Sequence, residues 1–208
     1  MLWEGSKMIL ENKLGLEDPV ELAVIEEKIS KKKAVELFES GFLNELEAGK
    51  FSSLAAIHAC LFDEIYPFAG IIRDVNIAKG NFRFAPVMYL DAALKNIDEM
   101  PQISFEEIIE KYVEMNIAHP FREGNGRSTR IWLDLMLKKG IGQVIDWSLI
   151  DKNDYLLAME RSPIKDIEIK HLLQRALTDK VSDREVYIKG IDASYFYEGF
   201  AVFKAKEL

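Results

Sequence analysis

Apolar residues recur along most of the chain at the spacing of one face of an α-helix. This pattern predicts helices over residues 20–42, 54–68, 87–100, 105–117, 128–139, 154–162 and 166–178. The first of these is interrupted near Ser30, which we interpret as an N-cap. The second should end at Pro67, because proline cannot continue a helix. The sequence therefore predicts an all-α protein.

One segment departs from the helical pattern. Residues 73–86 alternate polar and apolar side chains on both sides of Lys79-Gly80-Asn81. Alternation around a glycine-bearing turn is typical of a β-hairpin. An isolated hairpin is only marginally stable, so we expect this one to lie on the helical body, with one edge free to pair with another chain. On the pattern alone, a hairpin that merely connects two helices is the simpler interpretation.

The composition limits the class of protein. The chain has 208 residues, of which 49% are hydrophobic and 30% charged, and this excludes a disordered or low-complexity chain. The net charge of −8 argues against sequence-independent binding of nucleic acid. The single cysteine, Cys60, excludes a disulfide framework and a cysteine-based zinc site. Only His58, His119 and His171 are left for metal or acid–base chemistry.

Two further patterns concern the surface and the location of the protein. The basic run Lys31-Lys32-Lys33 is flanked by glutamates, which predicts a solvated helix face. No apolar run approaches the roughly 18 residues needed to cross a membrane, and the first residues lack the order of a signal peptide. No linker rich in Gly, Ser or Pro divides the chain. We therefore expect one compact, soluble, cytoplasmic domain.

The most informative stretch runs from His119 to Arg130 and reads HPFREGNGRSTR. It places a glycine-bearing loop between two amphipathic helices, and the free N–H groups of such a loop and helix N-terminus suit an anion. Arg127 and Arg130 lie on one face of the first helical turn, where each cation opposes the helix dipole by about 0.3–1 kcal/mol. That arrangement is expected where a polyanion binds or where an acidic group neutralises the arginines.

Two residues of the same stretch add chemistry. Glu123 supplies a carboxylate beside the anion site, which is how Mg²⁺ commonly bridges protein and phosphate. His119 can take up a proton near neutral pH. Taken singly, the histidine is explained as a helix cap, the Gly-Asn-Gly as a turn and the arginines as a surface pair. Their combination in one short segment indicates a phosphate site.

Residues 119–130 match every specified position of His-Pro-Phe-x-(Asp/Glu)-Gly-Asn-Gly-Arg-x-x-Arg, and the sequence therefore resembles the Fic domain. The resemblance covers about residues 51–169 and implies a helical bundle with a hairpin flap over the active site. It divides the chain into an N-terminal helical segment (1–50), a Fic core (51–170) and a C-terminal region (171–208). Fic proteins typically transfer AMP from ATP to a Tyr, Thr or Ser hydroxyl of a target protein and release pyrophosphate.

The resemblance also implies roles for individual residues. His119 would be the general base, Phe121 would anchor the loop in the core, and Glu123 would hold Mg²⁺. Arg127 and Arg130 would bind the β- and γ-phosphates of ATP. The other implied ATP contacts are Lys79, Gly80, Asn81 and Phe82 of the hairpin, Asn116, the anion hole Gly124-Asn125-Gly126 with Ser128 and Thr129, and Leu156, whose helix, with Tyr155 and Met159, would wall the adenine.

A second resemblance lies near the C-terminus. Residues 194–199, Ser-Tyr-Phe-Tyr-Glu-Gly, resemble the inhibitory motif (Ser/Thr)-x-x-x-Glu-(Gly/Asn) of the C-terminally inhibited Fic class. On a helix, Ser194 and Glu198 share one face. The resemblance implies that Glu198 pairs with Arg130 where the γ-phosphate belongs, and Gly199 completes the motif. It also implies a homo-oligomer that buries this helix, with Tyr195 and Tyr197 as candidate self-modification sites.

The sequence thus predicts an autoinhibited protein adenylyltransferase that binds ATP, Mg²⁺ and a target protein docked on the flap, with neither nucleic acid nor a membrane as partner. Other activities stay open. The same residues would serve removal of AMP, with Glu198 directing water, or transfer of phosphate or phosphocholine. A toxin of a toxin–antitoxin pair and a non-catalytic nucleotide sensor are alternatives of another class. The intact His119 argues against the sensor, and the built-in inhibitory motif argues against a separate antitoxin.

Overall fold

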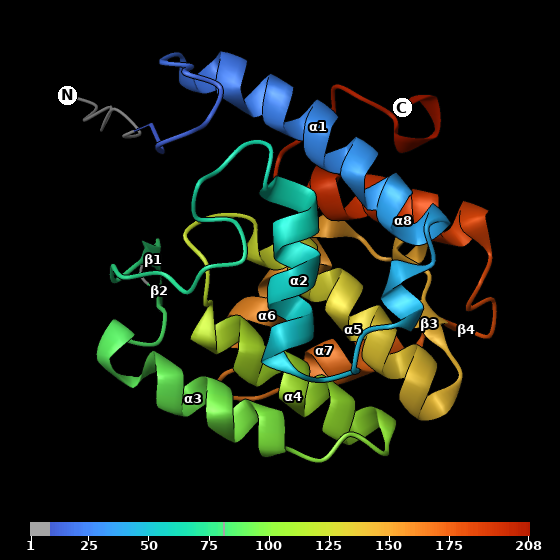
Figure 1. Ribbon diagram of the computed structural model, residues 1–208. Helices are drawn as coiled ribbons and strands as arrows, with labels where there is room; N and C mark the ends of the chain where they lie inside the picture. Colours follow the sequence, from blue (N-terminus) through green and yellow to red (C-terminus); the bar gives the residue numbers. More distant parts are fainter. Residues whose placement is uncertain (1–8, 81) are drawn as a thin grey trace.

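The computed structural model describes residues 9–80 and 82–208, and this part of the chain is mostly helical, as predicted (Figure 1). The helices are α1 (Pro19–Glu39), α2 (Phe51–Phe62), α3 (Val87–Glu99), α4 (Phe105–Ala118), α5 (Asn125–Ile141), α6 (Lys152–Arg161), α7 (Ile167–Gln174) and α8 (Arg184–Tyr197). Three short 3₁₀ turns are Phe42–Asn44, Trp147–Leu149 and Ala205–Glu207. Two antiparallel pairs join β1 (Ala78–Lys79) to β2 (Phe82–Arg83) and β3 (Val144–Ile145) to β4 (Leu177–Thr178).

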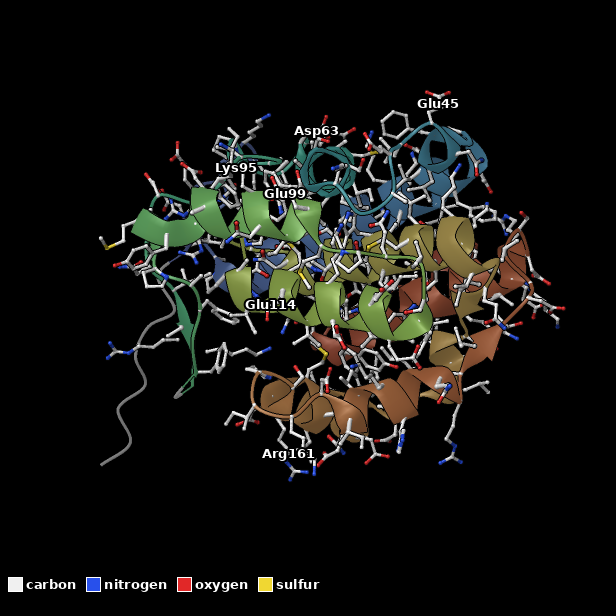
Figure 2. All side chains as sticks on the ribbon, turned by 90° about the horizontal axis from the view of Figure 1, so that it is seen from below. Glu45, Asp63, Lys95, Glu99, Glu114 and Arg161 are labelled. Carbon is white, nitrogen blue, oxygen red and sulfur yellow. The ribbon has the colours of Figure 1, made fainter. Side chains whose placement is uncertain are left out.

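Helix α5 runs through the middle of the molecule, and the other helices pack around it (Figure 1). Helices α2 and α4 flank α5, while α1 covers α2 and α8. Trp132 and Leu133 of α5 are fully buried, so its apolar face forms the centre of the core. The labelled charged side chains Glu45 and Arg161 point outward at opposite sides of the molecule (Figure 2). No helix in the described residues combines the length and apolar character required to cross a membrane.

The flap, which we define as residues 75–85, contains the predicted hairpin at the edge of the bundle (Figure 1). Lys79 pairs with Phe82, and Gly80 occupies the turn with a φ of 59°. The strands are only two residues long, so most of the predicted alternating segment is irregular. Asn81, the other predicted turn residue, lies outside the described residues.

Helix α1 is continuous, and the predicted interruption at Ser30 is wrong. The Ser30 hydroxyl is buried and donates a hydrogen bond of 2.6 Å to the Glu26 carbonyl one turn earlier. A mid-helix serine can satisfy its hydroxyl in this way without ending the helix. The actual N-cap is Asp18, whose side chain accepts hydrogen bonds from the amides of Val20 and Glu21.

The basic run is not uniformly solvated, because Lys31 is only 1% exposed. Its ammonium lies 3.0 Å from Glu27 and 3.1 Å from Asp192 of α8, and it donates to the Phe203 carbonyl at 2.6 Å. Glu27 in turn accepts hydrogen bonds from the amides of Val202 and Phe203. Lys31 and Glu27 therefore tie α1 to α8 and to the C-terminal segment, a contact that local sequence could not reveal.

We expect Lys31→Met to lower the free energy of unfolding by about 3–5 kcal/mol, because it leaves two carboxylates without their buried cation. Lys32→Met is the matched control, since Lys32 is 59% exposed and lies 3.9 Å from its nearest carboxylate partner, Glu36. The control should change stability by less than about 0.5 kcal/mol. Urea unfolding, monitored by circular dichroism, measures the free energy of unfolding of both variants. An equal decrease in this free energy for the two would contradict the prediction.

Three predicted helices end at least three residues early, the first of them at Glu39 rather than at Phe42. Helix α2 stops at Phe62 rather than near Pro67, and a separate turn follows in which the amides of Ile65 and Tyr66 both donate to the Phe62 carbonyl. Helix α7 ends at Gln174, and the last predicted residues, Leu177 and Thr178, pair as β4 with β3 instead. Helix α5 begins at Asn125, three residues before the predicted start, so the Gly-Asn-Gly loop forms its first turn.

Candidate active site

The loop between α4 and α5 is held in one shape by its own side chains. Asn125 accepts a hydrogen bond from the Phe121 amide and donates one to the Phe121 carbonyl, both at 2.8 Å. The Phe121 ring is fully buried. Gly124 has a φ of 76°, and a side chain there would collide with the Phe62 ring at 2.4 Å. The loop is therefore built around positions that only these residues fill well.

His58 of α2 contacts the same loop and supports it. Its Nδ1 accepts a hydrogen bond from the Gly70 amide at 2.9 Å, so its Nε2 carries the proton and donates to the Glu123 carbonyl at 2.8 Å. Its ring stacks on Phe121 at 3.8 Å. Burial lowers the pKa of His58 to about 4, which keeps the imidazole neutral. His58 is thus a structural support for the loop.

His119 ends α4 in a left-handed backbone conformation, with a φ of 49°, and is the one non-glycine residue with positive φ in the described chain. Its Nδ1 lies 3.3 Å from the Asn116 carbonyl, which can only accept, so Nδ1 carries the proton and Nε2 keeps its lone pair. The ring stacks on Phe84 of the flap at 3.7 Å. Burial lowers the pKa of His119 to about 4. The imidazole is therefore neutral and has one nitrogen ready to accept a proton.

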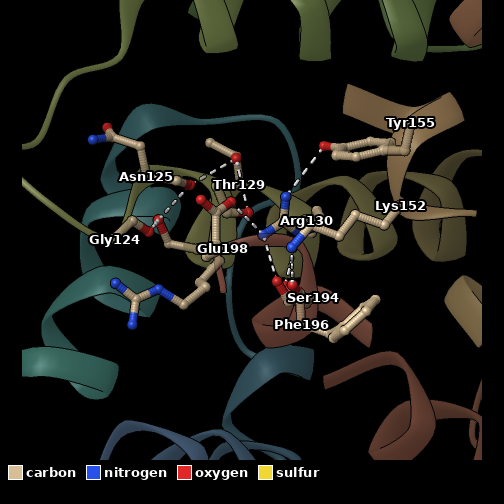
Figure 3. A network of polar contacts seen from close by, with 12 residues as sticks. Gly124, Asn125, Thr129, Arg130, Lys152, Tyr155, Ser194, Phe196 and Glu198 are labelled. Atoms are coloured by element: carbon tan, nitrogen blue, oxygen red, sulfur yellow. Dashed lines mark hydrogen bonds and ion pairs between the residues drawn. The ribbon is translucent and has the colours of Figure 1, made fainter. Parts of the chain in front are cut away.

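Arg130 of α5 is enclosed by the end of α8 (Figure 3). Its Nε donates to the Ser194 hydroxyl at 2.7 Å, and one Nη donates to both the Ser194 carbonyl at 3.0 Å and Glu198 at 2.8 Å. The other Nη lies 3.3 Å from the Tyr155 hydroxyl. Every nitrogen of this guanidinium is engaged, and the motif near the C-terminus supplies three of the four contacts.

The Glu198 carboxylate lies at the N-terminus of α5. A Cβ atom at Gly126, in the first turn of that helix, would come within 2.3 Å of the Glu198 Oε1 atom. Glu198 Oε2 lies 3.9 Å from the Lys79 ammonium of the flap. Burial alone would raise the pKa of Glu198, but the charge and hydrogen bond of Arg130, aided by Lys79, lower it to about 2. This end of α5 therefore holds an anion, as helix N-termini do.

Arg127 faces a different direction from Arg130. Its guanidinium is 1% exposed, forms an ion pair with Glu26 of α1, and lies 3.2 Å from Glu123. It also sits over the rings of Phe62, Tyr195 and Phe200, at 4.7–5.3 Å from their centroids. The structure therefore joins Arg127 to α1, to the end of α8 and to Phe200 beyond it, and a contact with phosphate would require these side chains to move apart.

Comparisons with known proteins agree with this geometry. Residues 50–137 match the family model described as the Fic/DOC family. The chain is 30% identical over 166 residues to the probable protein adenylyltransferase y4lH of Sinorhizobium fredii, which it covers over 83% of that protein's length. The chain belongs to the Fic/DOC family.

Two further comparisons define the extent of this likeness. Protein adenylyltransferase VbhT of Bartonella schoenbuchensis is 28% identical over 194 residues, which is 86% of this chain but 39% of VbhT. The chain thus spans about two fifths of that relative. The crystal structure of BepC from Bartonella tribocorum, solved with AMPPNP bound, superposes with a TM-score of 0.67 at 23% identity, covering 85% of this chain and 95% of BepC. That similarity confirms the Fic fold.

Some of the residues expected in a Fic nucleotide site lie close together in the structure, whereas the side chains of others bond within the loop and the first turn of α5. Lys79, Gly126, Arg130, Ser194 and Glu198 converge at the N-terminus of α5. The hydroxyls of Ser128 and Thr129 instead bond to carbonyls of the first turn of α5. The Asn125 side chain is likewise occupied within the loop.

The remaining predicted contacts lie at the margin of the site. Phe82 packs edge-on against Phe84 of the flap, and Gly80 is exposed at its tip. Asn116 is half-buried and contributes its carbonyl to His119. Leu156 is half-buried beside Tyr155 on α6, while Tyr155 and Met159 belong to the core. Gly199 follows the C-cap of α8, Glu198, and has a φ of 96°.

The two predicted self-modification sites are inaccessible in this conformation. Tyr195 is 1% exposed and Tyr197 is 4% exposed. The Tyr197 hydroxyl donates to the carbonyls of Trp147 and Ile150. Because Tyr195 and Tyr197 pack inward from α8, neither hydroxyl can reach a nucleotide unless the helix leaves its place.

Sequence reasoning missed two residues that shape the Fic site, His58 and Glu26. His58 lies on the apolar face of α2 between Leu54 and Phe62, which predicts burial but not its partners. Glu26 is 4% exposed and accepts hydrogen bonds from Tyr66 and Arg127. A glutamate in an acidic helical segment gives no local signal of such burial, because both partners are distant in sequence.

Because the pKa of His119 is low, we expect kcat/KM for AMP transfer to change little as the pH falls from 8 to 6. A histidine with an ordinary pKa near 6.5 would lose about fourfold of its neutral form between pH 8 and pH 6. With a pKa of about 4, His119 stays neutral over that range, so kcat/KM should fall by less than about 1.2-fold. Initial rates at saturating Mg²⁺ measure this, and a fourfold fall would show that the imidazole titrates normally.

Proposed function

We propose that this protein is a protein adenylyltransferase that transfers AMP from ATP to a hydroxyl side chain of a target protein. The observation that carries the proposal lies at the N-terminus of α5, where Arg130 binds the carboxylate of Glu198 and the absence of a side chain at Gly126 leaves room for that carboxylate. The neutral His119, the complete Fic motif and relatives named as adenylyltransferases support it.

In the proposed reaction, His119 Nε2 takes the proton of the target hydroxyl. The hydroxyl oxygen forms a bond to the α-phosphorus, and the bond from that phosphorus to the bridging oxygen breaks, releasing pyrophosphate. The α5 N-terminus and Arg130 hold the phosphates in line for attack. Positioning and charge neutralisation supply most of the acceleration in such reactions. Lys79 and the flap cover the nucleotide and present the target.

Glu123 is the residue that would hold Mg²⁺. Its side chain is 45% exposed beside the anion site, and its Oε1 accepts from Arg127 and the Gly124 amide. Within the described residues, no three His, Cys, Asp or Glu side chains form a metal cluster. One accessible carboxylate fits Mg²⁺, which commonly binds one or two carboxylates together with substrate phosphates and water. When bound, the ion neutralises charge on the phosphates.

Autoinhibition by α8 is part of the same proposal. Glu198 and the γ-phosphate compete for Arg130, so ATP binds in an unproductive pose until α8 moves. Tyr195 and Tyr197 are candidates for self-modification only after that movement, since both hydroxyls are buried while α8 is docked.

The proposal is tested by incubating the protein with ATP and Mg²⁺ in a bacterial lysate. Glu198→Gly supplies the released form, and ATP labelled at either the α- or the γ-phosphate supplies the readout. We expect protein bands labelled from α-labelled ATP only, with none when His119→Ala is added to the variant. Label from γ-labelled ATP would identify a kinase activity instead, and no label from either would contradict transfer.

Removal of AMP is the second candidate, because Glu198 is ionised and lies beside the phosphate site, where it can direct a water. To distinguish the two activities, the AMP-modified protein from the first experiment is incubated with either the wild type or Glu198→Gly, and the loss of label is measured. Faster loss of label with the wild type would favour removal.

We also propose a homo-oligomer that covers α8. Phe196, near the end of that helix, is 52% exposed, and Val202 beyond it is 65% exposed, which leaves apolar surface for a second copy. If the oligomer holds the inhibitory helix in place, specific activity should rise several-fold as enzyme concentration falls from micromolar to nanomolar. Label transfer over that range, with sedimentation to follow dissociation, measures this. Constant specific activity would contradict it.

A further inference from the structure

Arg73 precedes the flap, and its guanidinium is buried beneath it at 2% exposure. All four hydrogen bonds that its side chain makes within the described part of the chain go to main-chain carbonyl oxygens. A buried cation bonded only to carbonyls is unusual, because burial normally calls for a carboxylate partner. The position of those carbonyls explains the arrangement.

Two of the carbonyls belong to the end of α4. Arg73 Nε donates to the His119 carbonyl at 2.8 Å, and one Nη lies 3.2 Å from the Ala118 carbonyl. The last carbonyls of a helix have no partner within it and carry the negative end of its dipole, so they suit a cation. The Arg73 amide also donates to the Pro120 carbonyl at 2.8 Å. Arg73 therefore fixes the backbone on both sides of the catalytic imidazole.

The other two carbonyls belong to the two legs of the flap. Arg73 donates to the Val75 carbonyl at 2.8 Å, before β1, and to the Ala85 carbonyl at 2.5 Å, after β2. The Ala85 amide donates to the Ile117 carbonyl of α4 at 3.0 Å. One guanidinium thus joins both legs of the flap to the residue that ends α4.

We propose that Arg73 is a positioning residue, which sets the distance and angle between the flap that presents the target hydroxyl and the His119 imidazole that deprotonates it. This inference rests on the proposed transferase function. His119 adopts a left-handed backbone conformation that is strained for a non-glycine residue, so surrounding contacts must hold it. Arg73 supplies those contacts and makes the flap and the base a single unit.

The first test does not depend on activity. Nuclear magnetic resonance of ¹⁵N-labelled histidine follows the titration of His58, His119 and His171 in wild type, Arg73→Met and Arg73→Lys. The charged groups acting on His119 are Glu198, which raises its pKa, and Lys79 and Arg73, which lower it. Loss of Arg73 removes one of these cations and loosens the burial, so the pKa of His119 should rise by about one unit toward 6.5 in Arg73→Met.

Lys111→Met is the matched control. Lys111 lies in the middle of α4, is 1% exposed and donates to the Met100 carbonyl and to Gln102, which both precede the start of the helix. The control should lower the melting temperature without moving the His119 titration. An unchanged His119 pKa in folded Arg73→Met would overturn the proposal. If Arg73→Met does not fold, the His119 titration in Arg73→Lys tests the proposal instead. One ammonium cannot bond to all four carbonyls, so we expect the pKa of His119 to rise in this variant too, by less than in Arg73→Met.

The second test measures label transfer from α-labelled ATP to lysate protein in the Glu198→Gly background. Arg73→Met should lower transfer about 100-fold, while the Kd for ATP changes by less than about threefold. Equal losses in transfer for Arg73→Met and Lys111→Met would assign Arg73 a purely structural role. If Glu198→Gly alone transfers no label, the proposed function fails, and the histidine titration still tests Arg73 separately.

Discussion

Glu198→Gly should raise the rate of AMP transfer by about 10- to 100-fold. The substitution removes a hydrogen bond of 2.8 Å between charged groups at Arg130, and such bonds contribute about 1.5–3 kcal/mol. That free energy no longer opposes the γ-phosphate, and each 1.4 kcal/mol corresponds to a factor of ten. Initial rates with α-labelled ATP measure the change. The Kd for ATP should fall more than the Kd for ADP, because only ATP carries the γ-phosphate.

The matched control for this variant is Glu185→Gly on the first turn of the same helix. Glu185 pairs with Lys189, and the substitution places a glycine inside α8, whereas Glu198 is the C-cap that follows its last helical residue. We expect its rate to match the wild type. A higher transfer rate in both variants would mean that weakening α8 is enough to release the activity. An unchanged transfer rate in both would contradict the inhibitory role of Glu198.

His119→Ala should lower the transfer rate by about 100- to 10,000-fold in the Glu198→Gly background, the range that a general base contributes. The physical reason is that Nε2 is the free proton acceptor of a neutral imidazole held by Asn116 and Phe84. ATP affinity should hardly change, because in the proposed reaction α5 and Arg130, not His119, hold the phosphates. Rates and equilibrium binding of α-labelled ATP together measure both effects.

His171→Ala provides the control for His119→Ala. His171 lies on α7 and is exposed, so its loss should leave both the rate and ATP binding unchanged. A weakened ATP affinity in His119→Ala would assign the histidine to nucleotide binding rather than proton transfer.

The sequence predicted those parts of the fold that depend on local pattern. Helices α3 and α4 begin at the predicted residues, because their apolar periodicity is strong and Ser104 with Glu107 forms a capping box at the start of α4. The hairpin followed from alternation around glycine. Predictions failed where a distant contact outweighed the local pattern, as at Leu177 and Thr178, which pair with β3 rather than continue a helix.

Lys31 and Arg127 show the same limit for charged residues. Local sequence places Lys31 in a basic run and Arg127 beside Arg130, so both are expected at solvent or at phosphate. Their burial depends on Glu27, Asp192 and Glu26, which belong to α1 and α8. A buried charge needs a partner at a specific place in space, and sequence spacing does not supply that place.

The sequence by itself determined the helical bundle and the glycine-bearing loop at residues 119–130, and its resemblance to the Fic domain predicted that Glu198 pairs with Arg130. These follow from periodicity, from glycine placement and from a short motif, all of which act over a few neighbouring residues. Only the tertiary structure decided that Arg130 pairs with Glu198 whereas Arg127 pairs with Glu26, that His58 supports the loop while His119 keeps a free ring nitrogen, and that Arg73 joins the flap to His119. Those assignments depend on carbonyls, rings and carboxylates that packing brings together from distant parts of the chain.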